Sequence, residues 1–251
     1  MMELNKIYNE DCLDTMAKMS DNFVDVIITS PPYNKAGYEG KIRKRHKNDT
    51  WKSRNIDYDD NSNNDFMNES EYQEKQVKVL NEMQRVLKDN GSVFYNHKIR
   101  VANHKASHPI EWILKSNLNL RQQIIWNRKG SPALSPIRYL PTTELIFWLT
   151  KTNIQPNFIR HKNTHFTGEV WEITPKPNKL HPAPFPEILV DNILKCIHNK
   201  NNITVYDPYS GSGTTCKVAN NYGFNFIGSE IVSSYIDVFN DSFNSIQKKL
   251  F

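Results

Sequence analysis

Short apolar, β-branched runs alternate along this chain with segments of helical periodicity. Strand-like runs occupy 23–29, 92–96, 120–126, 203–207 and 224–228, with a further apolar run at 143–150 and a β-like island at 169–173. Segments 70–88, 108–115, 185–198, 214–222 and 233–249 are typical of helices, and Asn90-Gly91 is expected to end the first of them. This alternation predicts an α/β fold built on one mostly parallel sheet.

The composition limits the classes of protein to which the chain can belong. Of its 251 residues 38% are hydrophobic, which is enough for a buried core, and no run approaches the roughly 18 apolar residues of a membrane span. The first residues contain no apolar signal segment, so we expect a cytoplasmic protein. Cys12, Cys196 and Cys216 are odd in number and far apart, which argues against a disulfide framework or a zinc site.

A strongly basic segment follows the first of these runs. Residues 35–54 hold eight Lys and Arg against two acids, a local charge of +6 (8 − 2), with Tyr38, His46 and Trp51 interleaved. Such a segment suits a polyanion, so we expect nucleic acid as a partner; a solvated loop is the alternative interpretation. Residues of about 35–66 and 130–180 are predicted insertions in a single domain spanning 1–251.

The strand predicted at 23–29 ends abruptly at Ser30-Pro31-Pro32-Tyr33. Two consecutive prolines fix φ and restrict the residue before each of them, so this turn holds its carbonyl groups in place. The Ser30 hydroxyl and the Pro31 carbonyl could accept hydrogen bonds from the two N–H groups of an exocyclic amine, and Tyr33 could stack on a nucleobase. The alternative is a structural turn in which Tyr33 is merely packed.

A second turn of interest follows the run at 203–207. There Asp207-Pro208-Tyr209-Ser210-Gly211-Ser212-Gly213-Thr214-Thr215 combines a tight glycine turn with a helix start, and Glu230 follows the next strand. Glycines let a ligand approach the backbone, and an acid at that place can accept hydrogen bonds from both ribose hydroxyls of an adenosine-type ligand. A purely structural strand–helix turn is the alternative.

The glycine spacing narrows the choice of nucleotide. A phosphate-binding P-loop requires a lysine that this turn lacks, and a dinucleotide fingerprint requires a third glycine where Cys216 stands. S-adenosylmethionine carries no phosphate and needs polar groups for its amino-acid end and an acid for its ribose. The residues therefore favour S-adenosylmethionine as the cofactor.

Together these motifs resemble the DNA amino-methyltransferases of bacterial restriction–modification systems, in the permuted β-class order that places the proline turn before the glycine turn. Segments 7–13, 124–130, 170–173 and 181–186 also resemble parts of that family. The resemblance implies a seven-stranded, mostly parallel methyltransferase sheet with an antiparallel strand and helices on both faces. It implies methyl transfer to a flipped base in double-stranded DNA. It leaves open a cognate restriction endonuclease as a separate protein and a homodimer.

The resemblance also implies roles for individual residues. The catalytic motif is Ser30, Pro31, Pro32 and Tyr33; the cofactor-binding residues are Asp11, Cys12, Phe185, Asp207, Tyr209, Ser210, Gly211, Ser212, Gly213, Thr214 and Glu230. Asp11 is equally a suitable N-cap for a helix beginning at Cys12, and Cys12 is equally suited to packing. Phosphate contacts are expected from Lys41, Arg43, Lys44, Arg45, Lys47, Lys52 and Arg54, and target recognition from about 130–180.

The first residue of the proline turn bears on the base that would be methylated. In the family, Ser at this place leans toward N4 of cytosine, whereas Asp or Asn leans toward N6 of adenine. Ser30 therefore favours cytosine, with adenine as the main alternative. A methyltransferase acting on protein glutamine usually has Asn first, and a non-catalytic DNA-binding subunit would not need both turns intact.

Overall fold

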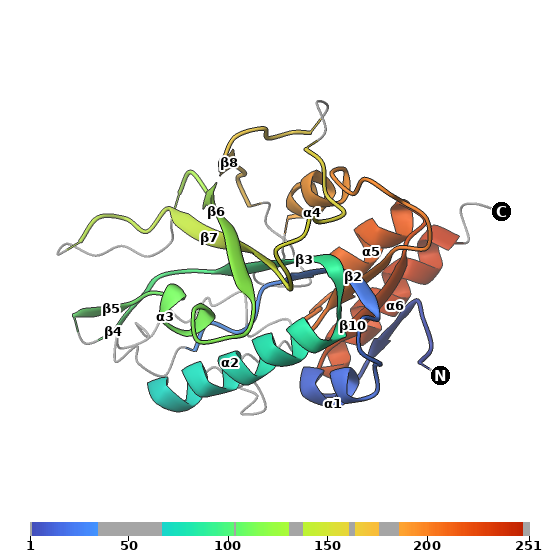
Figure 1. Ribbon diagram of the computed structural model, residues 1–251, viewed down its shortest axis with the longest axis horizontal. Coiled ribbons are helices and arrows are strands. Elements are labelled where there is room, and N and C mark those ends of the chain that lie inside the picture. Colours follow the sequence, from blue (N-terminus) through green and yellow to red (C-terminus); the bar gives the residue numbers. More distant parts are fainter. Residues whose placement is uncertain are drawn as a thin grey trace, which may run out of the picture.

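Among the described residues, one eight-stranded sheet forms the centre of the fold (Figure 1). The computed structural model describes residues 2–34, 67–102, 104–130, 138–160, 164–175 and 186–247. For residues 244–247 it describes the backbone alone. The strands lie in the order β1 (Lys6–Tyr8), β10 (Asn225–Ser229), β9 (Thr204–Asp207), β2 (Val24–Thr29), β3 (Leu87–His97), β7 (Thr143–Thr150), β6 (Asn119–Asn127) and β8 (Val170–Glu172).

The pairing confirms a mostly parallel sheet. Strands β1, β10, β9, β2 and β3 pair in parallel, and β6 pairs in parallel with β8. Only β7, among the described strands of this sheet, runs in the opposite direction, because it is antiparallel to both β3 and β6. The expected number of strands was seven; the additional one is the three-residue edge strand β8.

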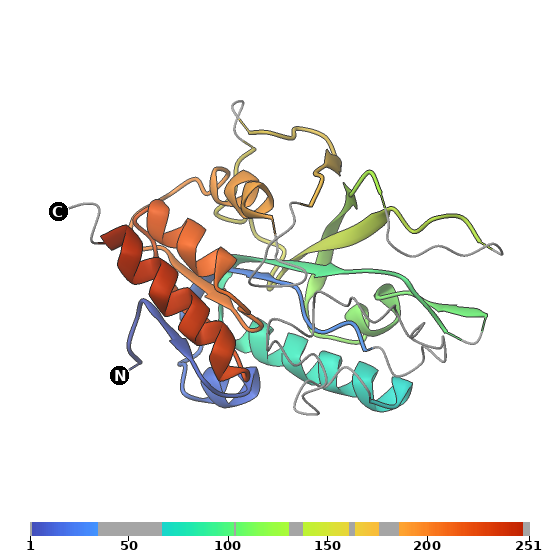
Figure 2. The same ribbon diagram turned by 180° about the vertical axis from the view of Figure 1, so that it is seen from behind.

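Helices cover both faces of the sheet and enclose two hydrophobic cores (Figures 1 and 2). One core receives α1 (Cys12–Ala17), α2 (Glu69–Val86) and α3 (Ile110–Ile113), and the other receives α4 (Glu187–Leu194), α5 (Thr214–Asn221) and α6 (Ser233–Gln247). Successive residues of a strand point to opposite faces. In β2, accordingly, Ile27 packs in the first core and Val26 and Ile28 in the second.

Three predicted helix limits are wrong. Asn90-Gly91 does not end α2: the helix ends at Val86, Leu87 is already extended, and Gly91 lies inside β3. A Cβ at Gly91 would lie 2.9 Å from the Asp25 carbonyl oxygen, so this glycine permits close strand contact. Helix α3 has four residues rather than the eight of 108–115. Helix α4 ends at Leu194 rather than 198, because Ile197 forms a β-bridge with Phe158.

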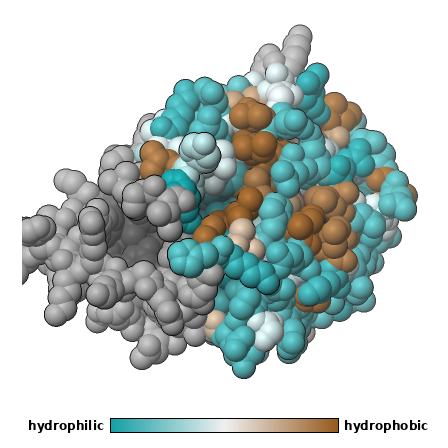
Figure 3. Space-filling model, turned by 90° about the vertical axis from the view of Figure 1, so that its left-hand side faces the viewer, coloured by the Kyte–Doolittle hydropathy of each residue, from teal (hydrophilic) through white to brown (hydrophobic). Residues whose placement is uncertain are grey.

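A short hairpin of β4 (Arg100–Ala102) and β5 (Lys105–Ser107) lies outside the main sheet. On the face shown in Figure 3, brown hydrophobic patches are separate from one another within a largely hydrophilic surface. No helix in the described part of the chain has the length and apolar character to cross a membrane.

Candidate active site

The carboxyl ends of the central parallel strands meet at one edge of the sheet. The residues that follow β2 form the proline turn (residues 30–34), and those that follow β9 form the glycine turn (residues 208–213). The residues after β1 and β10 reach the same edge, where Asn9 Nδ2 donates to the Glu230 carbonyl oxygen at 2.9 Å. Ligands of open α/β sheets bind outside the carboxyl ends of the strands, so this edge is the candidate site.

Ser30 and Tyr33 of the proline turn belong to a partly buried polar cluster. The Tyr33 hydroxyl donates to Glu144 Oε2 at 2.8 Å and lies 2.9 Å from Ser30 Oγ. Burial and the negative charge of Glu144 raise the pKa of Tyr33 well above its usual value. Tyr33 is therefore a protonated hydrogen-bond donor over the whole physiological pH range.

Two further residues hold Glu144 in this cluster. Asn96, near the end of β3, donates from Nδ2 to Glu144 Oε2 at 2.9 Å, to Tyr33 Oη at 2.6 Å and to Ser30 Oγ at 3.2 Å. Arg128, directly after β6, pairs with Glu144 Oε1 at 2.6 Å. Asn96 Oδ1 and Arg128 Nε are buried and have no hydrogen-bond partner among the described residues. Such groups are uncommon in folded proteins and are often explained by a ligand or water.

Contacts with α2, with β3 and with Met67 also hold the proline turn in place. The Tyr72 hydroxyl of α2 donates to the Pro32 carbonyl oxygen at 2.7 Å, and the ring of His97 lies 4.6 Å from that of Tyr33. Burial lowers the pKa of His97 to about 3, so its imidazole is neutral. At the end of the turn, Asn34 exchanges two hydrogen bonds of 3.0 Å with the backbone of Met67.

A buried carboxylate joins the proline turn to the glycine turn. Asp207 Oδ1 accepts hydrogen bonds from Thr29 Oγ1 at 2.8 Å and from the Tyr209 amide at 3.1 Å. Thr29 directly precedes Ser30, and Asp207 ends β9. Burial raises the pKa of Asp207 to about 6, although the hydroxyls of Thr215 and Thr29 favour its charged form.

The backbone of the glycine turn combines two left-handed residues with close packing. Gly211 has φ +50° and Gly213 has φ +76°, conformations that side chains disfavour. A Cβ at Gly213 would lie 2.2 Å from Cδ2 of Phe239 in α6. Gly213 therefore has a structural reason to be glycine, independent of any role in ligand binding.

Glu230 lies directly after β10 and faces the glycine turn. Its Oε2 accepts the Gly211 amide at 2.8 Å, and its Oε1 accepts the Val232 amide at 2.9 Å. Burial raises the pKa of this carboxyl, although both amides act in the opposite direction. Each carboxylate oxygen has a second lone pair, so the side chain retains capacity for two further donors.

Asp11 and Cys12 lie at the start of α1. Asp11 is the N-cap of this helix, accepting the Leu13 amide at 2.9 Å, and its other oxygen pairs with Lys75 at 3.1 Å. Burial opposes ionisation of Asp11, but the amide and the ammonium outweigh it and lower its pKa. Cys12 is buried, and burial raises its pKa to about 12. Burial and the neighbouring Cys12 thiol raise the pKa of the Tyr209 hydroxyl well above its usual value.

The structure brings most of the predicted site residues to this edge. They are Asp11, Cys12, Ser30, Pro31, Pro32, Tyr33, Asp207, Tyr209, Ser210, Gly211, Ser212, Gly213, Thr214 and Glu230. Phe185 and the seven basic residues between 41 and 54 lie outside the described residues. Trp171, in one of the segments that resemble the family, is buried in the core.

Sequence reasoning missed Glu144, Asn96 and Arg128. Glu144 is the one charged residue in the apolar run 143–150, and a lone acid in a buried strand is a usable signal for a functional site. Asn96 and Arg128 carry no comparable signal. The proximity of Asn96 to Ser30 depends on the pairing of β2 with β3, and that of Arg128 to Glu144 depends on the pairing of β6 with β7.

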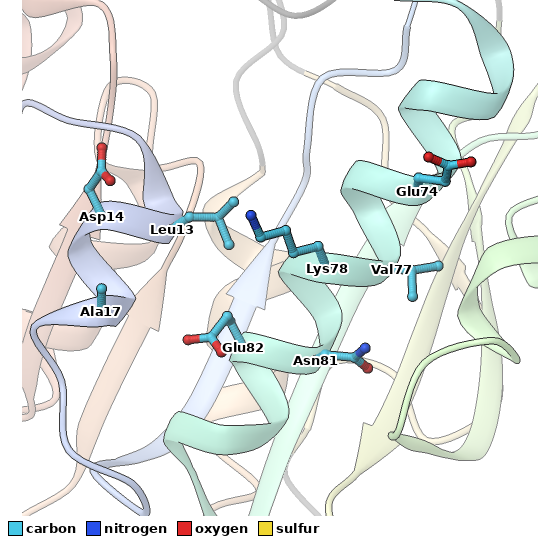
Figure 4. A pocket seen from close by; sticks show the side chains of 8 residues that line it. All are labelled: Leu13, Asp14, Ala17, Glu74, Val77, Lys78, Asn81 and Glu82. Carbon is cyan, nitrogen blue, oxygen red and sulfur yellow. The ribbon is translucent and has the colours of Figure 1, made fainter.

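A separate groove lies between α1 and α2 (Figure 4). Leu13, Asp14 and Ala17 line it from α1, and five residues of α2 line it from the other side, including Glu74 and Glu82. None of the predicted catalytic or cofactor-binding residues lines this groove, so it is distinct from the candidate site.

Comparisons with known proteins agree with this arrangement. A model of the DNA methylase family with N6 or N4 specificity matches residues 24–241. The chain belongs to this DNA methylase family. The type II methyltransferase M.BglII from Bacillus subtilis is 27% identical over an alignment of 269 positions, gaps included. The alignment covers 94% of this methylase and 68% of the relative.

Solved structures share the fold of this DNA methylase. The cytosine-N4-specific PvuII DNA methyltransferase superposes with a TM-score of 0.72 at 18% identity, covering 96% of this chain and 86% of its own. The complex of M1.HpyAVI with S-adenosylmethionine superposes with a TM-score of 0.63 at 20% identity, covering 95% of this chain and 98% of its own.

Proposed function

We propose that this DNA methylase transfers a methyl group from S-adenosylmethionine to the exocyclic N4 of cytosine in double-stranded DNA. The observation that carries the proposal is the position of Ser30. Its hydroxyl stands at the end of β2, and the residue before it, Thr29, is hydrogen-bonded to Asp207 at the entrance of the glycine turn. An amino-group acceptor and a cofactor turn are thereby held on adjacent strands.

The Ser30 hydroxyl and the Pro31 carbonyl would accept hydrogen bonds from the two N–H groups of the target amine. The lone pair of such an amine is delocalised into the ring, and acceptors fixed on both N–H bonds favour a pyramidal nitrogen with a free lone pair. Preorganised dipoles of this kind need no reorganisation during the reaction. The amine loses its proton after the methyl group arrives, so no strong general base is required.

The glycine turn and its neighbours fit S-adenosylmethionine. The cofactor would supply an electrophilic methyl group on a sulfonium sulfur. Glu230 has lone pairs left for the ribose hydroxyls, Gly211 offers a close backbone approach, and the buried Tyr209 hydroxyl can serve as a donor beside the cofactor. Asp11 and Cys12 would approach the adenine, and Phe185 the methionine end.

We further propose that DNA lies over the proline turn, with the target base flipped toward Ser30. Lys and Arg of segment 35–54 would contact phosphates, and residues of about 130–180 would read the recognition sequence. Lys98 adds positive charge at the turn, because its ammonium lies 5.2 Å from the centre of the Tyr33 ring.

The test is methyl transfer from labelled S-adenosylmethionine to unmethylated genomic DNA, followed by mass spectrometry of the digested nucleosides. N4-methylcytosine would support the whole proposal. N6-methyladenine would keep the reaction class and overturn the inference from Ser30. Absence of both, in a folded protein that binds S-adenosylmethionine, would point to a protein acceptor or to a subunit without activity of its own.

A further inference from the structure

The cluster around Glu144 has a defined hydrogen-bond direction. A carboxylate only accepts hydrogen bonds, so the 2.8 Å contact uses the single proton of the Tyr33 hydroxyl. The 2.9 Å contact between Tyr33 and Ser30 must then use the proton of Ser30. The Ser30 hydroxyl therefore points toward Tyr33.

Asn96 reinforces this direction. Its amide group has two protons, and its two shortest contacts are with Tyr33 Oη and Glu144 Oε2. Both are acceptor positions if Tyr33 donates to Glu144. The contact with Ser30 is longer, at 3.2 Å, so the lone pairs of Ser30 Oγ are only weakly engaged by protein donors.

This direction matters because a serine hydroxyl can either donate or accept. A hydroxyl that pointed its proton at an incoming amino N–H would repel it. With its proton committed to Tyr33, Ser30 Oγ presents lone pairs instead. Arg128 pairs with the far oxygen of Glu144 and so fixes the carboxylate that begins the chain of hydrogen bonds.

We propose that Glu144 is a positioning residue that acts through the Tyr33 hydroxyl to orient Ser30 as an acceptor for the target amino group. The inference rests on the proposed function and deepens it. The carboxylate or amide oxygen of an Asp or Asn at the first position of the turn would be an acceptor without such help. A serine hydroxyl instead needs a neighbour, here Tyr33, that accepts its proton.

The first test is steady-state kinetics of Glu144→Gln, Tyr33→Phe and the double variant. We expect kcat to fall by about 10- to 100-fold in Glu144→Gln, less than the roughly 10²- to 10³-fold for direct loss of a preorganised group, because Ser30 itself is retained. KM values for DNA and S-adenosylmethionine should change by less than about twofold, since neither is held by Glu144. The double variant should be no slower than Tyr33→Phe, because both changes interrupt one chain. Losses that multiply, or an unchanged kcat in Glu144→Gln, would overturn the inference.

Glu82→Gln is the matched control, because Glu82 pairs with Arg85 at 2.9 Å on α2, away from the candidate site. Its kcat should equal that of the unaltered protein. A decrease equal to that of Glu144→Gln would show that loss of an arginine partner, rather than orientation of Ser30, causes the effect, and would contradict the inference.

A second test does not require activity. The Tyr33 hydroxyl proton should give a downfield ¹H resonance, identified by its loss in Tyr33→Phe. If Tyr33 donates to Glu144, this resonance should move upfield in Glu144→Gln and, by a smaller amount, in Ser30→Ala. If it does not respond to Glu144→Gln, the direction is wrong. This readout separates the inference from the proposed function, which fails alone if the unaltered protein methylates no DNA while the resonance behaves as expected.

Discussion

The Thr29 hydroxyl donates a buried hydrogen bond of 2.8 Å to Oδ1 of Asp207, a residue 178 positions later in the chain. Thr29 is the last residue before the proline turn, and Asp207 is the last residue of β9 before the glycine turn. The two turns are therefore joined by side chains as well as by the parallel pairing of β2 with β9.

Replacing Thr29 with Val should weaken this connection. The change removes a buried donor, leaving the Asp207 carboxylate with one hydrogen bond fewer, and should lower the free energy of unfolding by about 1–3 kcal/mol. Urea denaturation at neutral pH measures the effect. Thr29→Ser keeps the hydroxyl and is the matched control. Equal stability of Thr29→Val and Thr29→Ser would mean that the bond contributes nothing.

The pKa of Asp207 predicts a pH dependence of stability. The folded protein holds this proton more tightly than the unfolded chain, because burial raises the pKa from 3.8 to about 6. Between those two values the carboxyl's contribution to the free energy of unfolding falls as pH rises, and above the folded pKa it is constant. A shift of about 2 units corresponds to about 3 kcal/mol.

Asp207→Asn isolates this contribution, because the amide keeps an oxygen for Thr29 but does not titrate. The stability of the variant minus that of the unaltered protein should rise by up to about 3 kcal/mol between about pH 4 and pH 7. Urea denaturation across this range measures the difference. A difference that stays constant with pH would show that the Asp207 pKa is not raised.

The change Glu230→Ala should weaken the binding of S-adenosylmethionine. Loss of charge-assisted hydrogen bonds to the ribose predicts a Kd that rises by about 10- to 100-fold, measurable by titration calorimetry. Since Glu230 also holds the amides of Gly211 and Val232, an analogue without the 2′-hydroxyl provides the control. The unaltered protein should bind the analogue more weakly than the parent cofactor. If Glu230→Ala discriminates between them equally well, the ribose role is wrong.

The basic segment predicts a salt-dependent affinity for DNA. Changing Lys41, Arg43, Lys44 and Arg45 together to Gln should reduce the magnitude of the negative slope of log K against log salt. The reduction should be up to about 3.6, or roughly 0.9 for each phosphate contact that is lost. Filter binding between low and moderate salt gives the slope. Four exposed lysines at 6, 18, 78 and 115 provide an equal change of charge elsewhere. An identical slope in both variants would assign segment 35–54 to solvent.

Local sequence signals were sufficient to locate several strands of the central sheet. The run 143–150 coincides with β7, and the predicted strands at 203–207 and 224–228 lie within one residue of β9 and β10. Their apolar, β-branched composition reflects burial on both faces, which a sequence records directly. The junction of α2 with β3 was missed because Asn90-Gly91 is a common helix stop. Here contact with Asp25 in the neighbouring strand requires the glycine.

The polar cluster shows what local signals do not contain. Ser30 and Tyr33 could be selected because two prolines stand between them, but Glu144 follows Tyr33 by 111 positions. Its contact depends on the only described strand of the main sheet that runs antiparallel to its neighbours. A single sequence gives no register for such a pairing, so the partners of the proline turn emerged only from the structure.

The two hydrogen bonds between Asn34 and Met67 hold together the two residues that flank segment 35–66. Loop closure depends only weakly on length: doubling the number of residues between fixed ends costs about 0.6 kcal/mol. We therefore expect changes in the length of segment 35–66 to have little effect on the proline turn. In evolution or in protein engineering, the Asn34–Met67 hydrogen bonds would let the segment proposed to contact DNA change independently of the proline turn.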